Sequence, residues 1–345
     1  MSIVRKSIKL VVGCDSSNPY EDQLSQSLLS HQNIDEVKNS VYEFWRQPDD
    51  ADVLHIQWPE ALYNWKNPQP WEAAHLASVL DEWASMASIV TTVHNYKPHD
   101  LENWRRLYRL VYQNSNGIIH LGEASRDWFL DRYDFASGKM HAVIPHGNYT
   151  CFPDHVTSAE ARRQLNLGPD DFVCLCFGEI RHSEERDLLI EAFDHLSAQS
   201  KKLVVAGRSP PLSKRKLRYW RLRYDPRIDI HEGWIPDEEV QLYLRAADVL
   251  IIPREGVLNS GNVALGFTFG RPVVGPDEGV IGEVLTKTGN PVYEPGNAEA
   301  LAEAIGKVKG FQEQVGEQNK SYASEEMNWG KVASHHLNLY YEVLG

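Results

Sequence analysis

The sequence has no long apolar run, and this absence argues against a membrane-spanning protein. No stretch approaches the roughly 20 apolar residues that a transmembrane helix needs. The opening segment MSIVRKSIKLVVG is too poor in apolar residues for a secretory signal, and it leads directly into a predicted strand. We therefore expect a cytoplasmic protein that meets a membrane only by lying on its surface.

Cysteine is also scarce, with 4 residues in a chain of 345. Cys174 and Cys176 are two positions apart, a spacing that fits neither a zinc pair nor a redox motif. We expect buried free thiols in a reducing compartment.

Positive charge is in deficit, because the net charge is −13. A chain of this charge is a poor general partner for nucleic acid, whose phosphates need a basic surface. The exception is the basic, aromatic segment 212–227, LSKRKLRYWRLRYDPR. It could lie on anionic lipid as a peripheral membrane contact, or form a solvated amphipathic helix over a sheet.

Several catalytic signatures are missing. The chain contains no P-loop, no G-x-S-x-G and no H-E-x-x-H, and the loop after the first predicted strand, VVGCDSS, is not a G-x-G-x-x-G fingerprint. These absences argue against four activities: hydride transfer, ATP hydrolysis, serine hydrolysis and zinc proteolysis.

What is present is a repeated alternation of apolar runs and helical patterns. Strands are predicted at 8–14, 51–58, 88–95, 117–122, 140–147, 171–180, 202–207, 227–233, 249–253 and 271–276. Helices are predicted at 21–32, 71–86, 101–115, 123–134, 185–199, 237–248 and 261–270. A turn-rich, linker-like segment at 147–171 divides the two runs. The pattern predicts an α/β protein with two Rossmann-like, doubly wound parallel-sheet domains.

Open parallel sheets bind ligands beyond the carboxyl ends of their strands, so the loops there are the candidate sites. In "LNSGNVALGF", Ser260 is placed to cap a helix whose first amides are unpaired, and Gly261 lets a ligand approach the backbone. Such a helix start suits a phosphate. A plain serine cap with a glycine turn explains the same residues.

Two arginines follow other strand ends of the C-terminal half. Arg181, in FGEIRHSEERD, could hold a phosphate as a bidentate donor, or pair with Glu184 or Glu185 at the surface. Arg208, after the strand that ends in VVAG, is a second candidate cation.

In the N-terminal half, the loop TTVHNYKPHD places His94 and Asn95 at a strand end, followed by Asp100. A histidine and an aspartate there suit the binding of sugar hydroxyls or general-base catalysis. Asp100 could equally be the cap of the next helix.

Taken in order, seven segments resemble bacterial glycosyltransferases of the GT-B fold, closest to the family-4 enzymes of polysaccharide and glycolipid assembly. They are VLHIQWPE, TTVHNYKPHD, VIPHGNY, FGEIRHSEERDLLIEAF, LVVAGR, GWIPDEEVQLYLRAADVLIIP and LNSGNVALGFTFGRPVVGPDEGVIGEV. The resemblance implies an acceptor-side domain over 1–155 and a nucleotide-sugar domain over 156–325, facing each other across a cleft. The closing helix over 326–345 would cross back to the first domain.

The resemblance also implies roles for single residues. His94 would lie beside the donor sugar, Arg181 would bind the diphosphate, and Glu283 would contact the nucleoside end of the donor. The loop residues Asn259, Ser260, Gly261 and Asn262 would hold the diphosphate together with Arg181, and Gly13 and Arg208 complete the candidate donor-binding set.

The sequence departs from the family pattern in two places. The family's pair of glutamates falls on Val257 and Leu265, and Glu255 is the nearby carboxylate that could substitute. The family's Arg and Lys fall on Glu179 and Glu184, which would repel a diphosphate. Either Arg181 and Arg208 replace those cations, or the donor chemistry is altered, or the chain does not transfer sugar.

The resemblance implies a glycosyltransferase that uses a GDP- or UDP-linked sugar, with no further cofactor and no metal. An inverting reaction needs a base near the acceptor, for which Asp100 and Asp15 are candidates, whereas in a retaining reaction the leaving phosphate can accept the proton. Two rival functions stay open: a non-catalytic protein that binds a nucleotide sugar, and another GT-B reaction such as epimerisation or phosphorolysis.

Overall fold

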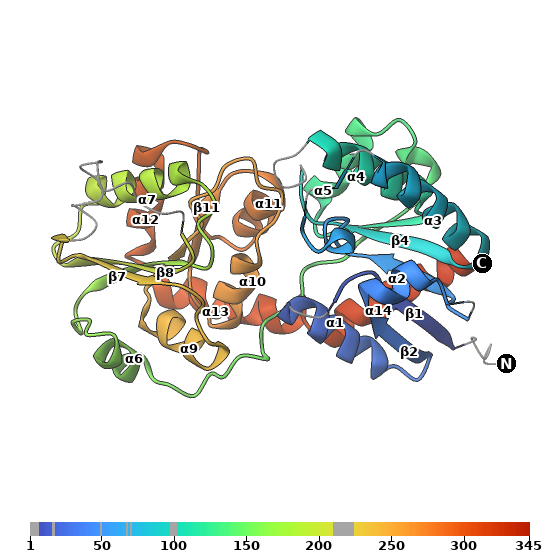
Figure 1. Ribbon diagram of the computed structural model, residues 1–345. Coiled ribbons are helices and arrows are strands. Elements are labelled where there is room, and N and C mark those ends of the chain that lie inside the picture. The colour runs from blue at the N-terminus through green and yellow to red at the C-terminus, as the bar shows by residue number, and fades with distance from the viewer. Residues whose placement is uncertain are drawn as a thin grey trace. The chain divides into compact units, whose positions relative to one another are not determined.

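The computed structural model describes residues 7–15, 18–48, 50–66, 68–69, 71–96, 102–209 and 224–345. It divides into two compact units, each built on a six-stranded parallel sheet (Figure 1). Unit 1 runs to Gly147 and also contains Glu326–Gly345, and unit 2 is Asn148–Glu325. The predicted fold class, two doubly wound parallel-sheet domains, is confirmed.

The sheet of unit 1 has the strand order β2-β1-β3-β4-β5-β6. Its strands are β1 (Ile8–Val12), β2 (Ile34–Asn39), β3 (Val53–Ile56), β4 (Ser88–Val93), β5 (Gly117–His120) and β6 (Met140–Val143). Since β1 pairs with both β2 and β3, the strand order reverses between β1 and β3. In open α/β sheets, ligands bind at the carboxyl ends of the strands at such a switch point.

Helices cover both faces of this sheet. They are α1 (Pro19–Leu29), α2 (Val41–Arg46), α3 (Glu72–Met86), α4 (Glu102–Asn114), α5 (Glu123–Arg132) and α14 (Trp329–Leu344), with short 3-10 turns at Ala61–Tyr63 and Ala136–Gly138. One apolar core joins the sheet to α1 and α14, and a second joins it to α2, α3 and α4. Figure 1 shows α3 and α4 side by side above β4, and α1 next to α14. The closing helix therefore packs on unit 1, as predicted.

The sheet of unit 2 has the order β12-β11-β10-β7-β8-β9. Its strands are β7 (Phe172–Phe177), β8 (Lys201–Gly207), β9 (Ile228–Glu232), β10 (Val249–Ile251), β11 (Val273–Pro276) and β12 (Val292–Tyr293). The order reverses between β7 and β10, so the switch point of this unit lies where those two strands end.

The helices of unit 2 are α6 (Ser158–Gln164), α7 (Ser183–His195), α9 (Asp237–Ala246), α10 (Gly261–Thr268), α11 (Gly279–Lys287), α12 (Ala298–Val308) and α13 (Gln312–Glu325). The core on one face joins α7 and α12 to β7, β8 and β10. Figure 1 shows α6 and α9 together on the other face. Helix α6 forms inside the segment expected to be a linker, because Thr157 and Glu160 make a complete capping box.

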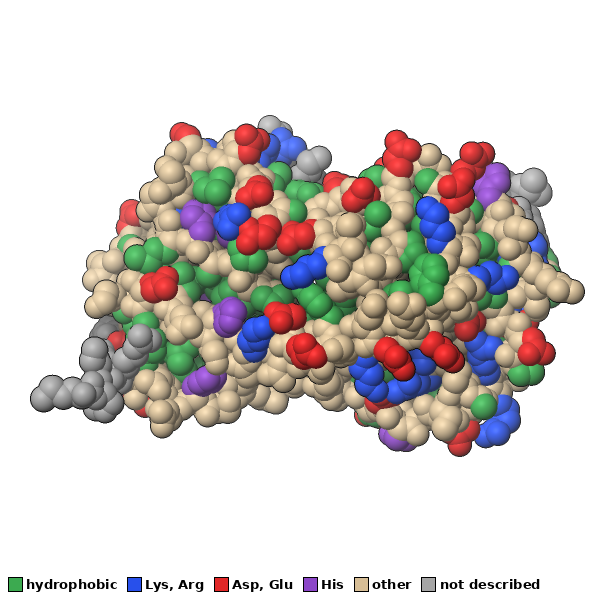
Figure 2. Space-filling model, turned by 180° about the vertical axis from the view of Figure 1, so that it is seen from behind, with side chains coloured by type: hydrophobic (Ala, Val, Ile, Leu, Met, Phe, Trp, Pro, Cys, Tyr) green, Lys and Arg blue, Asp and Glu red, His purple; other side chains and the backbone are tan. Residues whose placement is uncertain are grey.

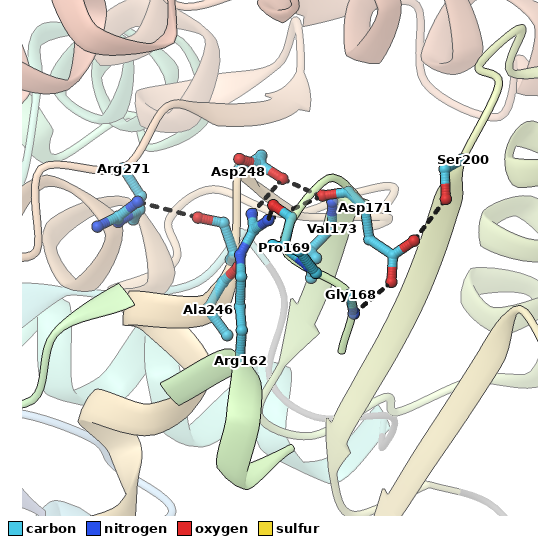
Figure 3. Close-up of polar contacts among 10 residues, drawn as sticks. Arg162, Gly168, Pro169, Asp171, Val173, Ser200, Ala246, Asp248 and Arg271 are labelled. Atoms are coloured by element: carbon cyan, nitrogen blue, oxygen red, sulfur yellow. Dashed lines mark hydrogen bonds and ion pairs between the residues drawn. The ribbon is translucent and has the colours of Figure 1, made fainter. Parts of the chain in front are cut away.

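A polar network ties together the amino ends of the unit 2 strands (Figure 3). The Arg162 guanidinium of α6 pairs with Asp248 at 2.8 Å and donates to the carbonyl oxygens of Ala246 and Pro169. Asp248 also accepts from the backbone N–H of Val173, at 2.7 Å. The network holds the amino ends of the strands in place, at the edge of the sheet opposite to the carboxyl ends.

The charged side chains on the surface and the polarity of the helices are those expected from the composition. Figure 2 shows acidic side chains scattered among basic ones over the face that it draws. Within the described residues, no helix has the length and apolar character that crossing a bilayer requires.

Candidate functional site

At the switch point of unit 2, two glycines let strand ends approach closely. Gly178 follows β7 with φ +92°, and Gly207 ends β8 with φ +142°. A Cβ on Gly207 would lie 1.8 Å from the carbonyl oxygen of Gly178, so no other residue fits there. The loops that carry Arg181 and Arg208 are thereby held together, and the Ile180 N–H donates to the Arg208 carbonyl at 2.8 Å.

The N-terminus of α10 lies against the end of β7. Ser260 is the N-cap, and its side chain accepts from the N–H of Asn262 at 3.4 Å. The side-chain Nδ2 of Asn262 donates to the carbonyl oxygen of Phe177 at 2.7 Å. Gly261 begins the helix, and Asn259 precedes the cap, half-buried. Residues 259–262 therefore lie together at the switch point, at the positively polarised N-terminus of α10.

A cation that the sequence analysis missed lies at this same switch point. Arg254 follows β10, and its Nη2 donates to the Glu179 carbonyl oxygen at 2.6 Å. Its Nε is 3.8 Å from Oε1 of Glu185, and the two side chains are only 14% and 10% exposed. The pair joins the ends of β10 and β7. In the sequence, Arg254 lies beside Glu255 in a short polar loop, and only the pairing of β7 with β10 reveals its position.

The residues between β7 and α7 are arranged around Glu185. Its Oε2 accepts from the backbone N–H of Arg181 at 3.0 Å. The side chains of Arg181, Glu179 and Glu184 are exposed, and the Ser183 hydroxyl donates to Glu184 at 3.1 Å. Arg208 is also exposed, and its guanidinium carbon is 5.9 Å from the ring centroid of Trp234.

The two remaining candidates of unit 2 lie on the side of β11 and β12. Glu255 is exposed and lies against Gly296, where an added Cβ would be 2.9 Å from its Oε1. Glu283 is half-buried on α11. Val257 and Leu265, which occupy the positions of the family's glutamates, are buried apolar side chains.

In unit 1, His94 follows β4 and is enclosed by polar and aromatic groups. Its Nε2 is 2.8 Å from Oε1 of Gln57, which follows β3. Its ring stacks on Trp58, with centroids 4.1 Å apart, and meets Tyr20 edge-on at 5.6 Å. The sequence analysis missed Gln57 and Trp58, although both follow a predicted strand in the segment VLHIQWPE.

The contact with Gln57 fixes the proton on His94. A carboxamide oxygen only accepts, so Nε2 carries the proton and donates it. Burial lowers the pKa of His94 well below 6.5, and the neighbouring His146 and His336 lower it further. His94 is therefore a neutral imidazole at pH 7. Its Nδ1 forms no hydrogen bond with the part of the chain that the structure describes, and its lone pair is available as an acceptor.

The hydrogen bonds continue from Gln57 into the unit. Nε2 of Gln57 is 3.3 Å from Nε2 of His55, and Nδ1 of His55 is 2.8 Å from the Tyr340 hydroxyl on α14. His55 is fully buried and also contacts the Thr92 hydroxyl at 2.8 Å. The closing helix thus supports the orientation of His94 through two intermediate side chains.

The other candidates of unit 1 have different surroundings. A Cβ on Gly13 would meet Leu62 at 3.1 Å, so this glycine serves close packing beside β1. Asp15 accepts from the backbone N–H of Val41 at 3.0 Å and ties its loop to the start of α2. Asp100 lies outside the described residues.

Comparisons with known proteins agree with this geometry. Residues 171–309 match the family model described as glycosyl transferases group 1. The chain is 24% identical over 306 residues to a GDP-mannose:glycolipid 4-beta-D-mannosyltransferase of Xanthomonas campestris, covering 85% of this chain and 80% of the relative. It is 28% identical over 337 residues to a lipopolysaccharide 1,2-N-acetylglucosaminetransferase of Salmonella typhimurium, covering 86% of each.

Solved structures share the fold. Anabaena HepE in complex with UDP superposes with a TM-score of 0.72 at 14% identity, covering 97% of this chain and 100% of that one. Sucrose-phosphate synthase of Thermosynechococcus elongatus also gives 0.72, at 16% identity, covering 98% and 99%. Both solved structures therefore share the two-sheet architecture of this chain.

Proposed function

We propose that this chain, which has the GT-B fold, is a glycosyltransferase of the family-4-like type, and that it transfers a sugar from a UDP- or GDP-linked donor to a saccharide or lipid-linked acceptor. The observation that carries the proposal is that the start of α10 and Arg254 both bond to the chain at the end of β7, through the carbonyl oxygens of Phe177 and Glu179. The names of the relatives support a GDP- or nucleotide-linked donor and a glycolipid or lipopolysaccharide acceptor.

In this proposal the donor diphosphate binds at Ser260, Gly261 and Asn262. The backbone N–H of Gly261, the first residue of α10, donates to its oxygens, and the helix dipole favours its charge. Arg181 and Arg208 reach it from the neighbouring loops, and Arg254 adds a positive charge that is held in place by Glu185.

These cations offset the exposed carboxylates of Glu179 and Glu184. They also supply the countercharge that a leaving diphosphate needs, and on this basis we propose that the reaction proceeds without a metal. Glu283 is the proposed contact to the nucleoside, and Gly13 a proposed close approach of the backbone to the donor.

The transfer breaks the bond from the anomeric carbon to the diphosphate oxygen and forms one to the acceptor oxygen. Neutral His94 is suited to accept a hydrogen bond from a sugar hydroxyl at Nδ1, because Gln57 holds its only proton on Nε2. In an inverting reaction the acceptor proton goes to a carboxylate, for which Asp100 and Asp15 are the candidates, and in a retaining reaction it goes to the leaving phosphate. Glu255 is the proposed substitute for the family's acidic pair.

We further propose that the protein works in the cytoplasm, at the membrane surface when its acceptor is lipid-linked. The glycolipid relatives and the basic composition of 212–227 support this placement. Most of that segment lies outside the described residues.

The test is a panel of UDP- and GDP-linked sugars, with thermal shift and nucleoside diphosphate release as the two readouts. A bound donor stabilises the folded chain by mass action and raises the unfolding temperature. Arg181→Ala should weaken donor binding by about tenfold or more, since a charge-assisted hydrogen bond is lost. Arg163→Ala, an exposed change on α6, is the matched control. A wild-type chain that shows neither readout with any donor contradicts the proposal.

One rival function has an observation in its favour. Val257 and Leu265 are buried apolar residues where the family carries glutamates, which favours a protein that binds a nucleotide sugar without transferring it. Donor binding without nucleoside diphosphate release, with any acceptor offered, would support this alternative.

A further inference from the structure

Unit 1 contains a cavity of about 360 Å³ that the functions above do not use. It is lined by residues of α4 and α5 and by Asn95 and Tyr96, the two residues that follow His94. Its volume is in the range of small-molecule sites. We call it the arginine pocket, because Arg105, Arg109 and Arg132 all line it.

The lining itself contributes positive charge and no carboxylate. No aspartate or glutamate is among its lining residues, although the chain as a whole has a net charge of −13. Arg109 pairs with Asp134 at 3.0 Å. Within the described residues, Arg105 and Arg132 have no carboxylate partner. Guanidinium groups that converge on a concave surface bind oxyanions, often through two parallel hydrogen bonds.

Apart from Asn95, the rest of the lining is aromatic. The rings of Tyr96 and Trp128 are 5.2 Å apart, and the Arg132 guanidinium carbon is 5.9 Å from the Trp128 ring. Buried Tyr108 is fixed in place by donating its hydroxyl proton to Glu60 at 2.6 Å. Flat apolar rings beside charged donors give a pocket for a ligand that has both a ring face and an anionic group.

We propose that the arginine pocket binds an oxyanion, a phosphate or a carboxylate, carried by a sugar of the acceptor. This inference rests on the proposed function and extends it, because it gives the acceptor a chemical class. The pocket adjoins His94 along the chain, so an acceptor whose anionic sugar sits there is held at the carboxyl end of β4.

The test is calorimetric titration of the whole protein with three sugars. Glucose 6-phosphate and methyl β-D-glucuronide provide the two sources of an oxyanion, and methyl β-D-glucoside is the neutral reference. We expect at least one anionic sugar to bind about tenfold or more tightly than the neutral one, an advantage that falls as salt screens the charges. The anionic sugar that binds identifies the source.

The double variant Arg105→Ala/Arg132→Ala should lose this advantage. Arg106→Ala/Arg126→Ala removes two arginines from the same helices outside the pocket lining and should keep it. Equal binding of charged and neutral sugars, or anionic binding that is unchanged in the pocket variant, overturns the inference.

Binding of UDP and GDP is measured on the same samples. A pocket variant that binds nucleotide and whose urea unfolding matches the wild type has both units folded, so its loss of anionic sugar binding is specific to the pocket. A wild-type chain that binds anionic sugars but neither binds nor cleaves nucleotide sugars contradicts the proposed function and leaves the pocket in place.

Discussion

A single side chain, Gln57, sets both the tautomer and the orientation of His94. Its oxygen accepts the His94 Nε2 proton, and its nitrogen faces His55. The imidazole cannot rotate without breaking this bond and leaving the stack on Trp58. A neutral, oriented histidine at a strand end is therefore a consequence of two residues that follow a different strand.

Replacing that amide by an acid should change the charge of the histidine. In Gln57→Glu, a carboxylate next to Nε2 raises the pKa of His94 and favours the imidazolium form. We expect sugar transfer at pH 7 to fall about tenfold or more, because Nδ1 then carries a proton and no longer accepts. Histidine proton resonances followed by NMR against pH report the pKa. A variant with full activity and an unchanged His94 titration contradicts this role; Gln113→Glu, on the exposed face of α4, is the control.

Arg254 offers a second test at the scale of one residue. In Arg254→Gln, the contact with Glu185 and the positive charge near α10 are both removed. We expect nucleotide affinity to fall about tenfold, as for the loss of one charged hydrogen bond. Arg227→Gln changes an exposed arginine before β9 and should leave affinity unchanged. Equal affinities of wild type and Arg254→Gln for UDP and GDP would remove Arg254 from the site.

The sequence indicated some of these residues and not others, for a physical reason. The positions of His94 and Ser260 follow from local patterns, a strand end and a helix cap. Gln57 and Arg254 gain their importance from which strands are neighbours, since β3 adjoins β4 and β10 adjoins β7. Strand order is a property of the whole sheet, and the spacing of residues in one loop does not predict it.

At the scale of elements, apolar runs identified the central strands but overestimated their length. The run predicted at 51–58 forms a strand only over Val53–Ile56, because Gln57 and Trp58 leave the ladder to form the site. The edge strand β2 (Ile34–Asn39) was not predicted. Its sequence, IDEVKN, is mostly polar, and an edge strand has less apolar surface to bury.

Helix α6 (Ser158–Gln164) lies in the segment predicted to be a linker, and its attachment can be tested. Arg162→Met removes the ion pair with Asp248 and the bonds to backbone carbonyls at the amino edge of the sheet (Figure 3). We expect the free energy of unfolding to fall by about 2–4 kcal/mol, as for a partly buried charged network. Urea unfolding measures it, and Arg163→Met on the same helix is the control. Nucleotide affinity should not change, because the site lies at the carboxyl edge; a weaker affinity would contradict that separation.

At the scale of the whole molecule, we expect the two units to respond differently to acid. Within the described residues, the histidines whose pKa burial lowers are His55, His94, His120, His146 and His336, and all belong to unit 1. For His146 and His336 the folded pKa is about 4, and for His120 about 3. In the unfolded chain these histidines have pKa values near 6.5. At pH values between the folded pKa and 6.5, the unfolded chain therefore binds more protons than the folded chain. Stability is therefore lost as the pH falls from about 6.5 towards 4.

His336 isolates one part of this effect, because it is fully buried in α14. A single such histidine lowers the free energy of unfolding by about 2 kcal/mol between pH 7 and pH 5. His336→Leu should therefore show a smaller loss of stability on acidification than the wild type, by about that amount. Urea unfolding at both pH values measures it, with exposed His195→Leu in unit 2 as the control. Identical losses in wild type and His336→Leu would show that this histidine does not set the acid sensitivity.

The placement of α14 also bears on how the chain is made. Unit 1 takes its last helix from beyond unit 2, and the Tyr340 hydroxyl completes the contacts of His55. During translation, every residue of Asn148–Glu325 leaves the ribosome before α14 does. The second unit can therefore finish folding first, while the first waits for its closing helix with an apolar face uncovered. A chain released after residue 326 would contain one complete lobe and one that is open to proteases and chaperones.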